Sequence, residues 1–181
     1  KEAGVHIPTL CYLKGINEIG ACRMCVVDTG ARAPQAACVL PATEGMVVKT
    51  NTPAIREARK INLELLLSNH EKTCLQCVRS TNCEFQTLCL DYGVEDVDKY
   101  KGEMAEHVVD NLSPAIVRNN DKCVLCRRCV AVCDQVQNVG VIGPVSRGFK
   151  TEIGSAFGVS LADAACINCG QCIAACPTAA L

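Results

Sequence analysis

Two short runs near the end of the sequence, CVLCRRCVAVC and CINCGQCIAACP, crowd cysteines at a fixed spacing. In each run, two residues separate successive members of a cysteine triplet, and a fourth cysteine follows after three more residues. The members are Cys123, Cys126, Cys129 and Cys133 in the first run, and Cys166, Cys169, Cys172 and Cys176 in the second. Three thiolates on one tight loop can bind three corners of an iron–sulfide cubane, and this is a known spacing of 4Fe–4S ligands.

The fourth cysteine of such a run points away from its own loop and reaches the second cluster, so the ligand sets are crossed. We expect one 4Fe–4S cluster on Cys123, Cys126, Cys129 and Cys176. We expect another on Cys166, Cys169, Cys172 and Cys133. The intervening segment, GVIGPVSRGFKTEIGSAFG, is rich in glycine and β-branched residues, which predicts short strands or turns that join the two halves.

Disulfides and zinc are the two alternatives for a chain with 16 cysteines in 181 residues. Disulfide frameworks are typical of secreted chains, and the first residues, KEAGVHIPTLC, have no apolar run of the signal-peptide type. Zinc sites close with four ligands, usually as two separated C-x-x-C pairs, and neither run has that form. The spacing therefore favours iron–sulfur clusters.

Four cysteines upstream follow a different pattern, C-x10-C-x2-C-x12-C, and they are Cys11, Cys22, Cys25 and Cys38. A leading ligand, a close pair and a distant fourth occur in this order in plant-type 2Fe–2S sites, although the first gap here is longer. Gly20 would let the backbone approach the sulfides, MCVVD predicts a strand, and AACVLPATEGMVVKT predicts two short strands around a turn. We expect a 2Fe–2S cluster, with a zinc site as the alternative.

A helix should precede the remaining cysteines, in the segment TNTPAIREARKINLELLLSNH. Thr52 can cap it and Pro53 suits its first position. Its apolar residues are expected along one face, and they are Ile55, Ala58, Ile61 and Leu65.

His70 ends this segment and begins the pattern H-x3-C-x2-C-x5-C, which continues with Cys74, Cys77 and Cys83. Three cysteines at cluster spacing need a fourth ligand, which we expect to be His70, with Cys89 as its rival. A neutral imidazole in place of a thiolate makes a cluster less negative and should raise its reduction potential.

The other chemistry-bearing residues have simpler interpretations. His6 and His107 have no neighbouring ligands, and Arg127 and Arg128 are expected to face solvent. The charged stretch after Cys89 is expected to be a solvated connector. Lysine and arginine number 18 against 19 acidic residues, which argues against a nucleic-acid surface, and no run is long enough for a membrane span.

These elements predict an α+β fold of three iron–sulfur units. Residues 1–48 are expected to form a partial β-grasp 2Fe–2S ferredoxin domain. Residues 49–105 are expected to form a small helical His/Cys3 4Fe–4S domain with its connector. Residues 106–181 are expected to form a bacterial-type ferredoxin domain with two 4Fe–4S clusters.

The order of these motifs resembles the N-terminal relay of iron-only (FeFe) hydrogenases, above all the catalytic subunit of the multimeric, NAD(P)-linked, electron-bifurcating type. The likeness covers almost the whole chain and is carried by IPTLCYLKGINEIGACRMCVVD, NLELLLSNHEKTCLQCVRSTNCE, SPAIVRNNDKCVLCRRCVAVC and SLADAACINCGQCIAACP. It implies one 2Fe–2S and three 4Fe–4S clusters on the ligands named above, including His70. It also implies further strands before Lys1, and a hydrogen-activating domain with the active-site cluster after Leu181.

The resemblance implies an oxidoreductase of an anaerobic cytoplasm, with no catalytic residue in this chain. The implied partners are flavin- and NAD(P)-binding iron–sulfur subunits of the same hetero-oligomer and a soluble ferredoxin, with no nucleic acid and no membrane span. Similar relays occur in the diaphorase small subunit of NAD-reducing nickel–iron hydrogenases, in NAD-dependent formate dehydrogenases and in the large iron–sulfur subunit of respiratory complex I. A free-standing polyferredoxin is the alternative from another class.

Overall fold

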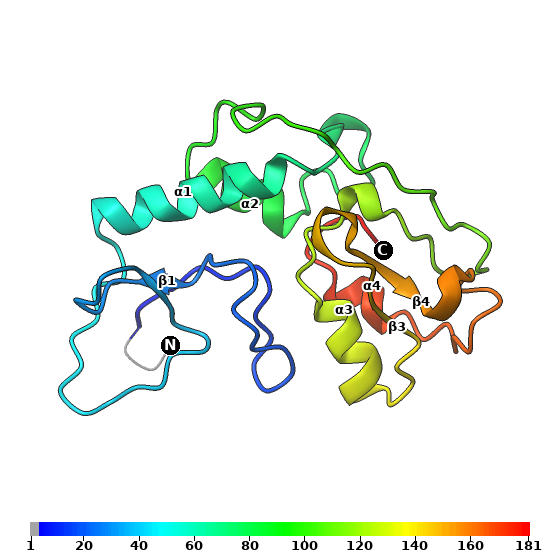
Figure 1. Ribbon diagram of the computed structural model, residues 1–181, viewed down its shortest axis with the longest axis horizontal. Coiled ribbons are helices and arrows are strands. Elements are labelled where there is room, and N and C mark those ends of the chain that lie inside the picture. Colours follow the sequence, from blue (N-terminus) through cyan, green and yellow to red (C-terminus); the bar gives the residue numbers. More distant parts are fainter. Residues whose placement is uncertain (1–3) are drawn as a thin grey trace.

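Short regular elements joined by long loops make up the computed structural model, which describes residues 4–181 (Figure 1). The helices are α1 (Pro53–Leu67), α2 (Glu84–Asp91), α3 (Arg128–Ala131) and α4 (Gln171–Ala175). The strands form two antiparallel pairs, β1 (Val26–Val27) with β2 (Gln35–Ala36), and β3 (Ile142–Val145) with β4 (Glu152–Ser155). Single helical turns occur at Cys74–Gln76, Asn120–Lys122, Val132–Val136, Gly148–Lys150 and Ala156–Gly158. The fold class is therefore α+β, with few helices and small sheets.

The strand expected in MCVVD is present as β1, which pairs with β2 so that Val26 lies opposite Ala36. The prediction of two strands around the PATEG turn is wrong. After β2, only an isolated bridge between Lys49 and Asp28 returns the chain to β1. The reason is burial, because Val47 is 72% exposed and the segment has no apolar face to place against a sheet.

Helix α1 begins as the sequence predicts, since the Thr52 hydroxyl accepts a hydrogen bond from the Ile55 amide at 3.2 Å and Pro53 follows the cap. Its buried face differs from the expected one, because Leu65 is 51% exposed. The buried residues are Ile55, Arg59, Leu63, Glu64 and Leu67. Most of them follow a four-residue repeat, and polar partners compensate the two charged members of this face.

The buried charges of α1 attach it to its neighbours. Arg59 donates to the Val26 carbonyl at 2.7 Å and to the Tyr92 hydroxyl at 3.1 Å. Glu64 accepts from the Lys99 ammonium at 2.7 Å. Helix α1 is therefore fixed to strand β1 on one side and to the segment after α2 on the other.

The third part of the chain contains the β3–β4 hairpin, in which Ile142 pairs with Ser155 and Val145 with Glu152. This confirms the short strands expected between the two cysteine runs. Helix α3 packs against α4 and against β3 (Figure 1). The hairpin therefore joins the two cysteine loops and covers the helices that follow them.

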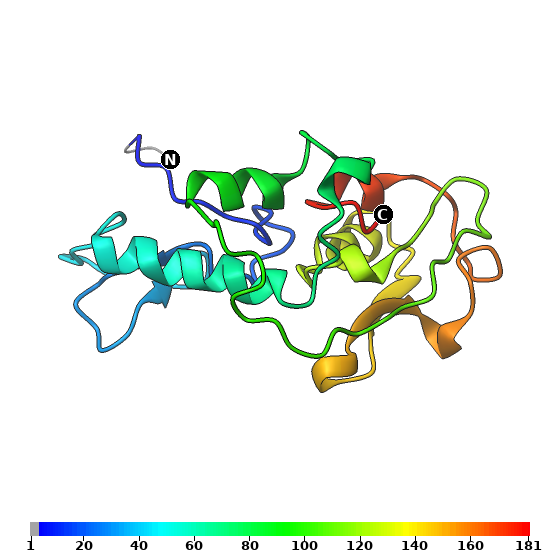
Figure 2. The ribbon, with the colours of Figure 1, turned by 90° about the horizontal axis from the view of Figure 1, so that it is seen from above.

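An extended connector follows Tyr92 and has no helix up to residue 111. Figure 2 shows this green segment running alongside the fold towards the hairpin. Lys72 pairs with Asp98, and the Ala105 amide donates to the Asn69 side chain at 2.8 Å. The connector therefore runs over the surface and is attached at only a few points.

One hydrophobic core draws on all three parts of the sequence. Its buried members are Leu10, Cys11, Cys22, Met24, Leu63, Leu67, Phe85, Val124 and Cys126. Three of these are candidate cluster ligands, so ligand side chains form part of the core itself. A second core lies under the hairpin and includes Cys129 and Cys172. None of the helices in the described part of the chain combines the length and apolarity needed to cross a bilayer.

Candidate iron–sulfur centres

The four upstream cysteines converge in the structure. The Sγ atoms of Cys25 and Cys38 are 3.4 Å apart, and the Cys22 amide lies 3.5 Å from the Cys11 sulfur. A hydrogen bond between the Cys11 and Cys22 thiols raises the pKa of Cys11 and lowers the pKa of Cys22 to about 6. Burial, together with the neighbouring Cys25 thiol, raises the pKa of Cys38 to about 11. These closely spaced thiols are suited to bind a metal cluster, whose metal ions would replace the thiol protons.

Gly20 shapes this loop with a left-handed backbone, at φ +63°, and its amide donates towards the Cys38 sulfur. An added Cβ would also meet Val39 at 3.4 Å. The sequence-based role of Gly20, close approach of the backbone to the cluster, is therefore consistent with its conformation.

Gly20→Ala should destabilise the loop by about 1–2 kcal/mol, the usual cost of a left-handed residue with a side chain. Thermal loss of the visible absorption of the 2Fe–2S centre measures this. Gly15→Ala is the matched control, because Gly15 has φ +70° with nothing within 4 Å of the added Cβ. Equal loss of absorption in both variants would show that backbone conformation alone, and not the approach to Cys38, sets the cost.

His70 is buried, and no hydrogen bond among the described residues joins its ring to a thiol. The ring packs edge-on against Phe85 with 5.1 Å between the centroids. Burial lowers the pKa of His70 to about 4, so the imidazole is neutral. Its Nδ1 atom is buried without a hydrogen-bond partner in the part of the chain that the structure describes. A buried neutral ring with an orphaned nitrogen fits a metal ligand.

The three cysteines after His70 lie on the surface side of the same region. Cys74 is exposed, and Cys77 and Cys83 are half-buried. Cys77 lies close enough to Cys83 to raise the pKa of that thiol, although burial is the main cause. This loop is therefore open to solvent at Cys74.

Cys89, the rival ligand, lies on α2 and packs half-buried against the main core. Burial raises its pKa to about 12, with smaller contributions from the thiols of Cys83 and Cys74. Cys89 is thus near this ligand set, and its packing is also that of a small apolar residue.

Two cavities of similar size lie in the third part of the chain. Each is small, with a volume of about 20 Å³. The first is lined by Cys123, Cys126, Cys129 and Cys176. The second is lined by Cys166, Cys169, Cys172 and Cys133. Each cavity therefore has three cysteines from one run and the fourth from the other run.

The two loops present backbone amides to their first cysteines in the same way. The Leu125 amide is 3.4 Å from the Cys123 sulfur, and the Asn168 amide is 3.4 Å from the Cys166 sulfur. Both amides belong to non-glycine residues with left-handed backbones, at φ +52° and +54°. Such strain is typical of functional loops, and here it directs donors at the atoms that would become anionic.

Burial makes the thiols of the first cavity poor anions on their own. It raises the pKa of Cys123 to about 11 and that of Cys126 to about 12, and it also raises the pKa of Cys129. Thiolates are stable there only when a positively charged group replaces the protons. All sixteen cysteines are free thiols in the part of the chain that the structure describes.

Two arginines join the His70 region to the first cavity, and the sequence did not reveal either role. Arg128 is buried and pairs with Glu84 at 2.8 Å, so the expectation that it faces solvent is wrong, whereas Arg127 is exposed. Arg79 donates to the Cys176 carbonyl at 3.0 Å. Both contacts depend on residues far away in sequence, so no local pattern could have indicated them.

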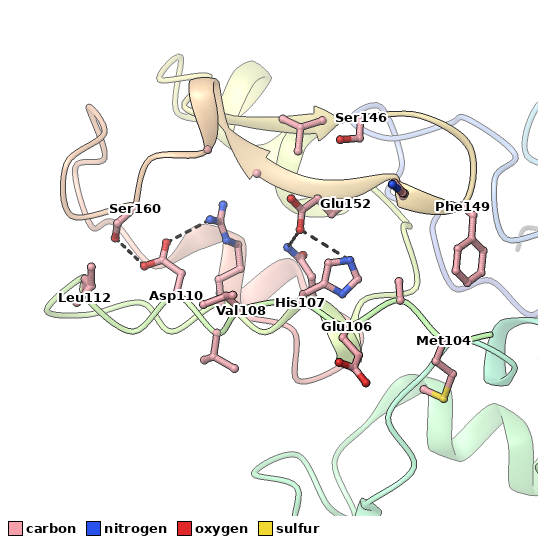
Figure 3. A pocket seen from close by; sticks show the side chains of 18 of the residues that line it. Met104, Glu106, His107, Val108, Asp110, Leu112, Ser146, Phe149, Glu152 and Ser160 are labelled. Carbon is pink, nitrogen blue, oxygen red and sulfur yellow. Dashed lines mark hydrogen bonds and ion pairs between the residues drawn. The ribbon is translucent and has the colours of Figure 1, made fainter.

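A wider groove lies apart from the cysteines, between the connector and the β3–β4 hairpin (Figure 3). His107 Nδ1 is 2.8 Å from the Asp121 carboxylate, and Asp110 pairs with Arg118 at 3.2 Å. Ser160 also donates to Asp110, as Figure 3 shows. His107 is therefore paired with a carboxylate, and these contacts attach the connector to the third part of the chain.

Known family models match three successive parts of the chain, in the same order as the three groups of candidate ligands. Residues 1–53 match a 2Fe-2S iron-sulfur cluster binding domain, and residues 59–98 match the NADH-ubiquinone oxidoreductase-G iron-sulfur binding region. Residues 122–180 match a 4Fe-4S dicluster domain. Along its whole length the chain is similar to iron–sulfur regions of NADH-quinone oxidoreductase G and NAD(P)-reducing hydrogenase subunits, and its three parts match iron–sulfur family models. It therefore holds clusters of both the 2Fe–2S and the 4Fe–4S type.

Individual relatives come from more than one kind of enzyme. The chain is 46% identical, over its whole length, to the HndD subunit of the NADP-reducing hydrogenase of Solidesulfovibrio fructosivorans, and it spans 32% of that protein. It is 39% identical, again over its whole length, to the G 2 subunit of the NADH-quinone oxidoreductase of Rhizobium meliloti, and it spans 21% of it. The chain thus spans about a third or less of these curated relatives.

A solved structure shares this arrangement. It is the crystal structure of an NAD+-reducing [NiFe]-hydrogenase in the H2-reduced state, with a TM-score of 0.90 and 27% sequence identity. The alignment covers 99% of this chain and 76% of the other. The likeness to hydrogenase subunits is thus shown at the level of the NAD(P)-linked family, without distinguishing iron-only from nickel–iron enzymes.

Proposed function

We propose that this chain relays single electrons through one 2Fe–2S and three 4Fe–4S clusters within an NAD(P)-linked redox complex. The observation that carries the proposal is the pair of equal-sized cavities, each lined by four cysteines drawn from both runs. Two such sites, next to a convergent upstream set and a buried neutral histidine, form a chain of redox centres. No residue of this region is assigned a catalytic role.

The proposed ligand sets follow the geometry. Cys11, Cys22, Cys25 and Cys38 hold the 2Fe–2S cluster. His70, Cys74, Cys77 and Cys83 hold one 4Fe–4S cluster, and the crossed sets of the two cavities hold the other two. When bound, the clusters supply one-electron carriers, while this chain buries the thiolates, directs amides at them and limits access of water. The division at residues 48 and 105 is proposed on the same basis.

The His70 set is adjacent to the first cavity. The Cys83 thiol lies 3.6 Å from the Pro177 carbonyl, next to Cys176 in the chain, and the Glu84 amide donates to the same carbonyl at 3.1 Å. Ligand-bearing backbones from two sets thus touch. This contact supports electron exchange between the surface-side His70 set and the buried first cavity.

We favour a parent enzyme of the FeFe hydrogenase type, with a hydrogen-activating domain outside this region. The support is the match, over the whole of this chain, to an NADP-reducing hydrogenase subunit and the motif order. In this proposal the partners are flavin- and NAD(P)-binding iron–sulfur subunits of a hetero-oligomer and a ferredoxin. The match to an NADH-quinone oxidoreductase favours a second candidate, a dehydrogenase relay. Reduction of the clusters by hydrogen in the complete protein separates the two, because only a hydrogenase performs it.

Cluster content tests the relay itself. The complete region should bind about 14 iron atoms per chain with matching acid-labile sulfide, as expected from one two-iron and three four-iron clusters. Anaerobic purification followed by colorimetric iron and sulfide analysis and electron paramagnetic resonance (EPR) measures this. Incubation with zinc under the same conditions is the control. Stoichiometric zinc with no labile sulfide would contradict the proposal.

A further inference from the structure

Asn17 connects two of the candidate centres through its side chain. Its Nδ2 atom donates to the Cys11 carbonyl at 2.7 Å and to the Cys126 carbonyl at 3.0 Å. Cys11 belongs to the proposed 2Fe–2S set, and Cys126, which is 109 residues from Asn17 in the sequence, belongs to the first cavity. One nitrogen atom therefore bridges the backbones of ligands from two different clusters.

The bridging side chain of Asn17 is buried from solvent, and hydrogen bonds fix its backbone. Asn17 is only 3% exposed, and its backbone exchanges two hydrogen bonds with Leu13, at 3.0 and 2.8 Å. Cys11 and Cys126 also belong to the same buried core. A buried amide with both of its protons donated has little freedom to move, so it fixes the separation of the two carbonyls.

We propose that Asn17 is a positioning residue that sets the spacing and the electronic coupling between the 2Fe–2S centre and the cluster of the first cavity. This inference rests on the relay function proposed above and assigns a direct link that bypasses the His70 set. On each side, only the cysteine's own backbone and β-carbon separate the hydrogen-bonded carbonyl from the ligating sulfur. In the transfer, one centre loses one electron and the other gains it, and Asn17 keeps both of its amide protons.

The chemistry of the side chain explains why an amide suits this position. Two carbonyl oxygens face the same point, and only a group with two donors satisfies both. A carboxylate of the same shape would repel both oxygens, and an apolar side chain would leave both without a partner. Asn17→Asp and Asn17→Leu therefore remove the bridge by two independent means.

The test measures the rate of electron transfer between the 2Fe–2S centre and its 4Fe–4S neighbour in the complete, cluster-loaded protein after flash photoreduction. Both Asn17 variants should slow this step at least several-fold and weaken the spin–spin interaction in EPR spectra of the reduced protein. Iron content should be unchanged in both variants, and the midpoint potentials of the two centres should be unchanged in the uncharged Asn17→Leu. Asn62→Leu is the matched control, because the Asn62 amide makes a single exposed hydrogen bond to Arg23 in the same 2Fe–2S loop.

An unchanged rate in variants that load all their clusters would overturn the bridge and leave the relay intact. A wild-type protein without iron or sulfide would instead overturn the relay. If neither Asn17 variant binds its full set of clusters, Cys77→Ser provides the test of the direct link, because this change removes the cluster of the His70 set. Direct exchange that persists in Cys77→Ser supports the bridge, and exchange that collapses contradicts it.

Discussion

Cys133→Ser should abolish the 4Fe–4S cluster bound by the 166–172 loop and spare the cluster of its own loop. Cys133 lines the cavity of Cys166, Cys169 and Cys172, so its loss removes one of four ligands there. The protein should lose about four iron atoms per chain, the content of one cubane. Iron and sulfide analysis with EPR measures the loss, and Cys176→Ser should spare the 166–172 cluster in the reciprocal way.

Double variants distinguish crossed from uncrossed ligand sets more clearly than any single variant does. Cys133→Ser combined with Cys169→Ser should lose no more iron than either change alone, because both remove ligands of one cluster. Cys133→Ser combined with Cys126→Ser should lose about twice as much, since two cubanes are affected. The opposite order of losses would mean that each run holds its own cluster.

His70→Cys should retain a four-iron cluster and lower its midpoint potential on the order of 100 mV, in the direction expected when a thiolate replaces a neutral imidazole. The physical reason is the additional negative charge at the cluster, in a region where burial keeps the imidazole of the wild type uncharged. His70→Ala should lose this cluster. Potentiometric EPR titration measures both effects.

Cys89→Ser is the control for the His70 variants, because Cys89 lies near the same thiols and is close in size to serine. It should keep all four clusters and their potentials. Loss of one cubane signal in Cys89→Ser, together with an unchanged potential in His70→Cys, would identify Cys89 as the ligand and His70 as a core residue.

Spacing and local chemistry allowed much of this structure to be predicted from the sequence. The cap at Thr52, the strand after Cys25 and the hairpin between the two runs depend on residues that are close in sequence, and the structure contains all three. The ligand sets were predicted from the same kind of local information. They stay predictions until cluster content is measured.

The remaining features depend on contacts between distant segments, which local patterns do not encode. Leu65 is exposed because its helix buries the charged side chains of Arg59 and Glu64 against partners outside α1. Arg128 is buried because Glu84 meets it from α2. Asn17 occupies an ordinary turn sequence, and only the folded chain shows which carbonyls it joins.

The main core has a consequence for how the protein would respond to damage. Cys11, Cys22 and Cys126 pack there beside Leu63 and Phe85, so the proposed ligands of two centres share one core with Phe85, which contacts the proposed ligand His70 of a third. Loss of one cluster to oxygen would therefore disturb the core packing around the neighbouring clusters. The clusters of the region would lose their visible absorption together in air, and they would have to be reassembled together.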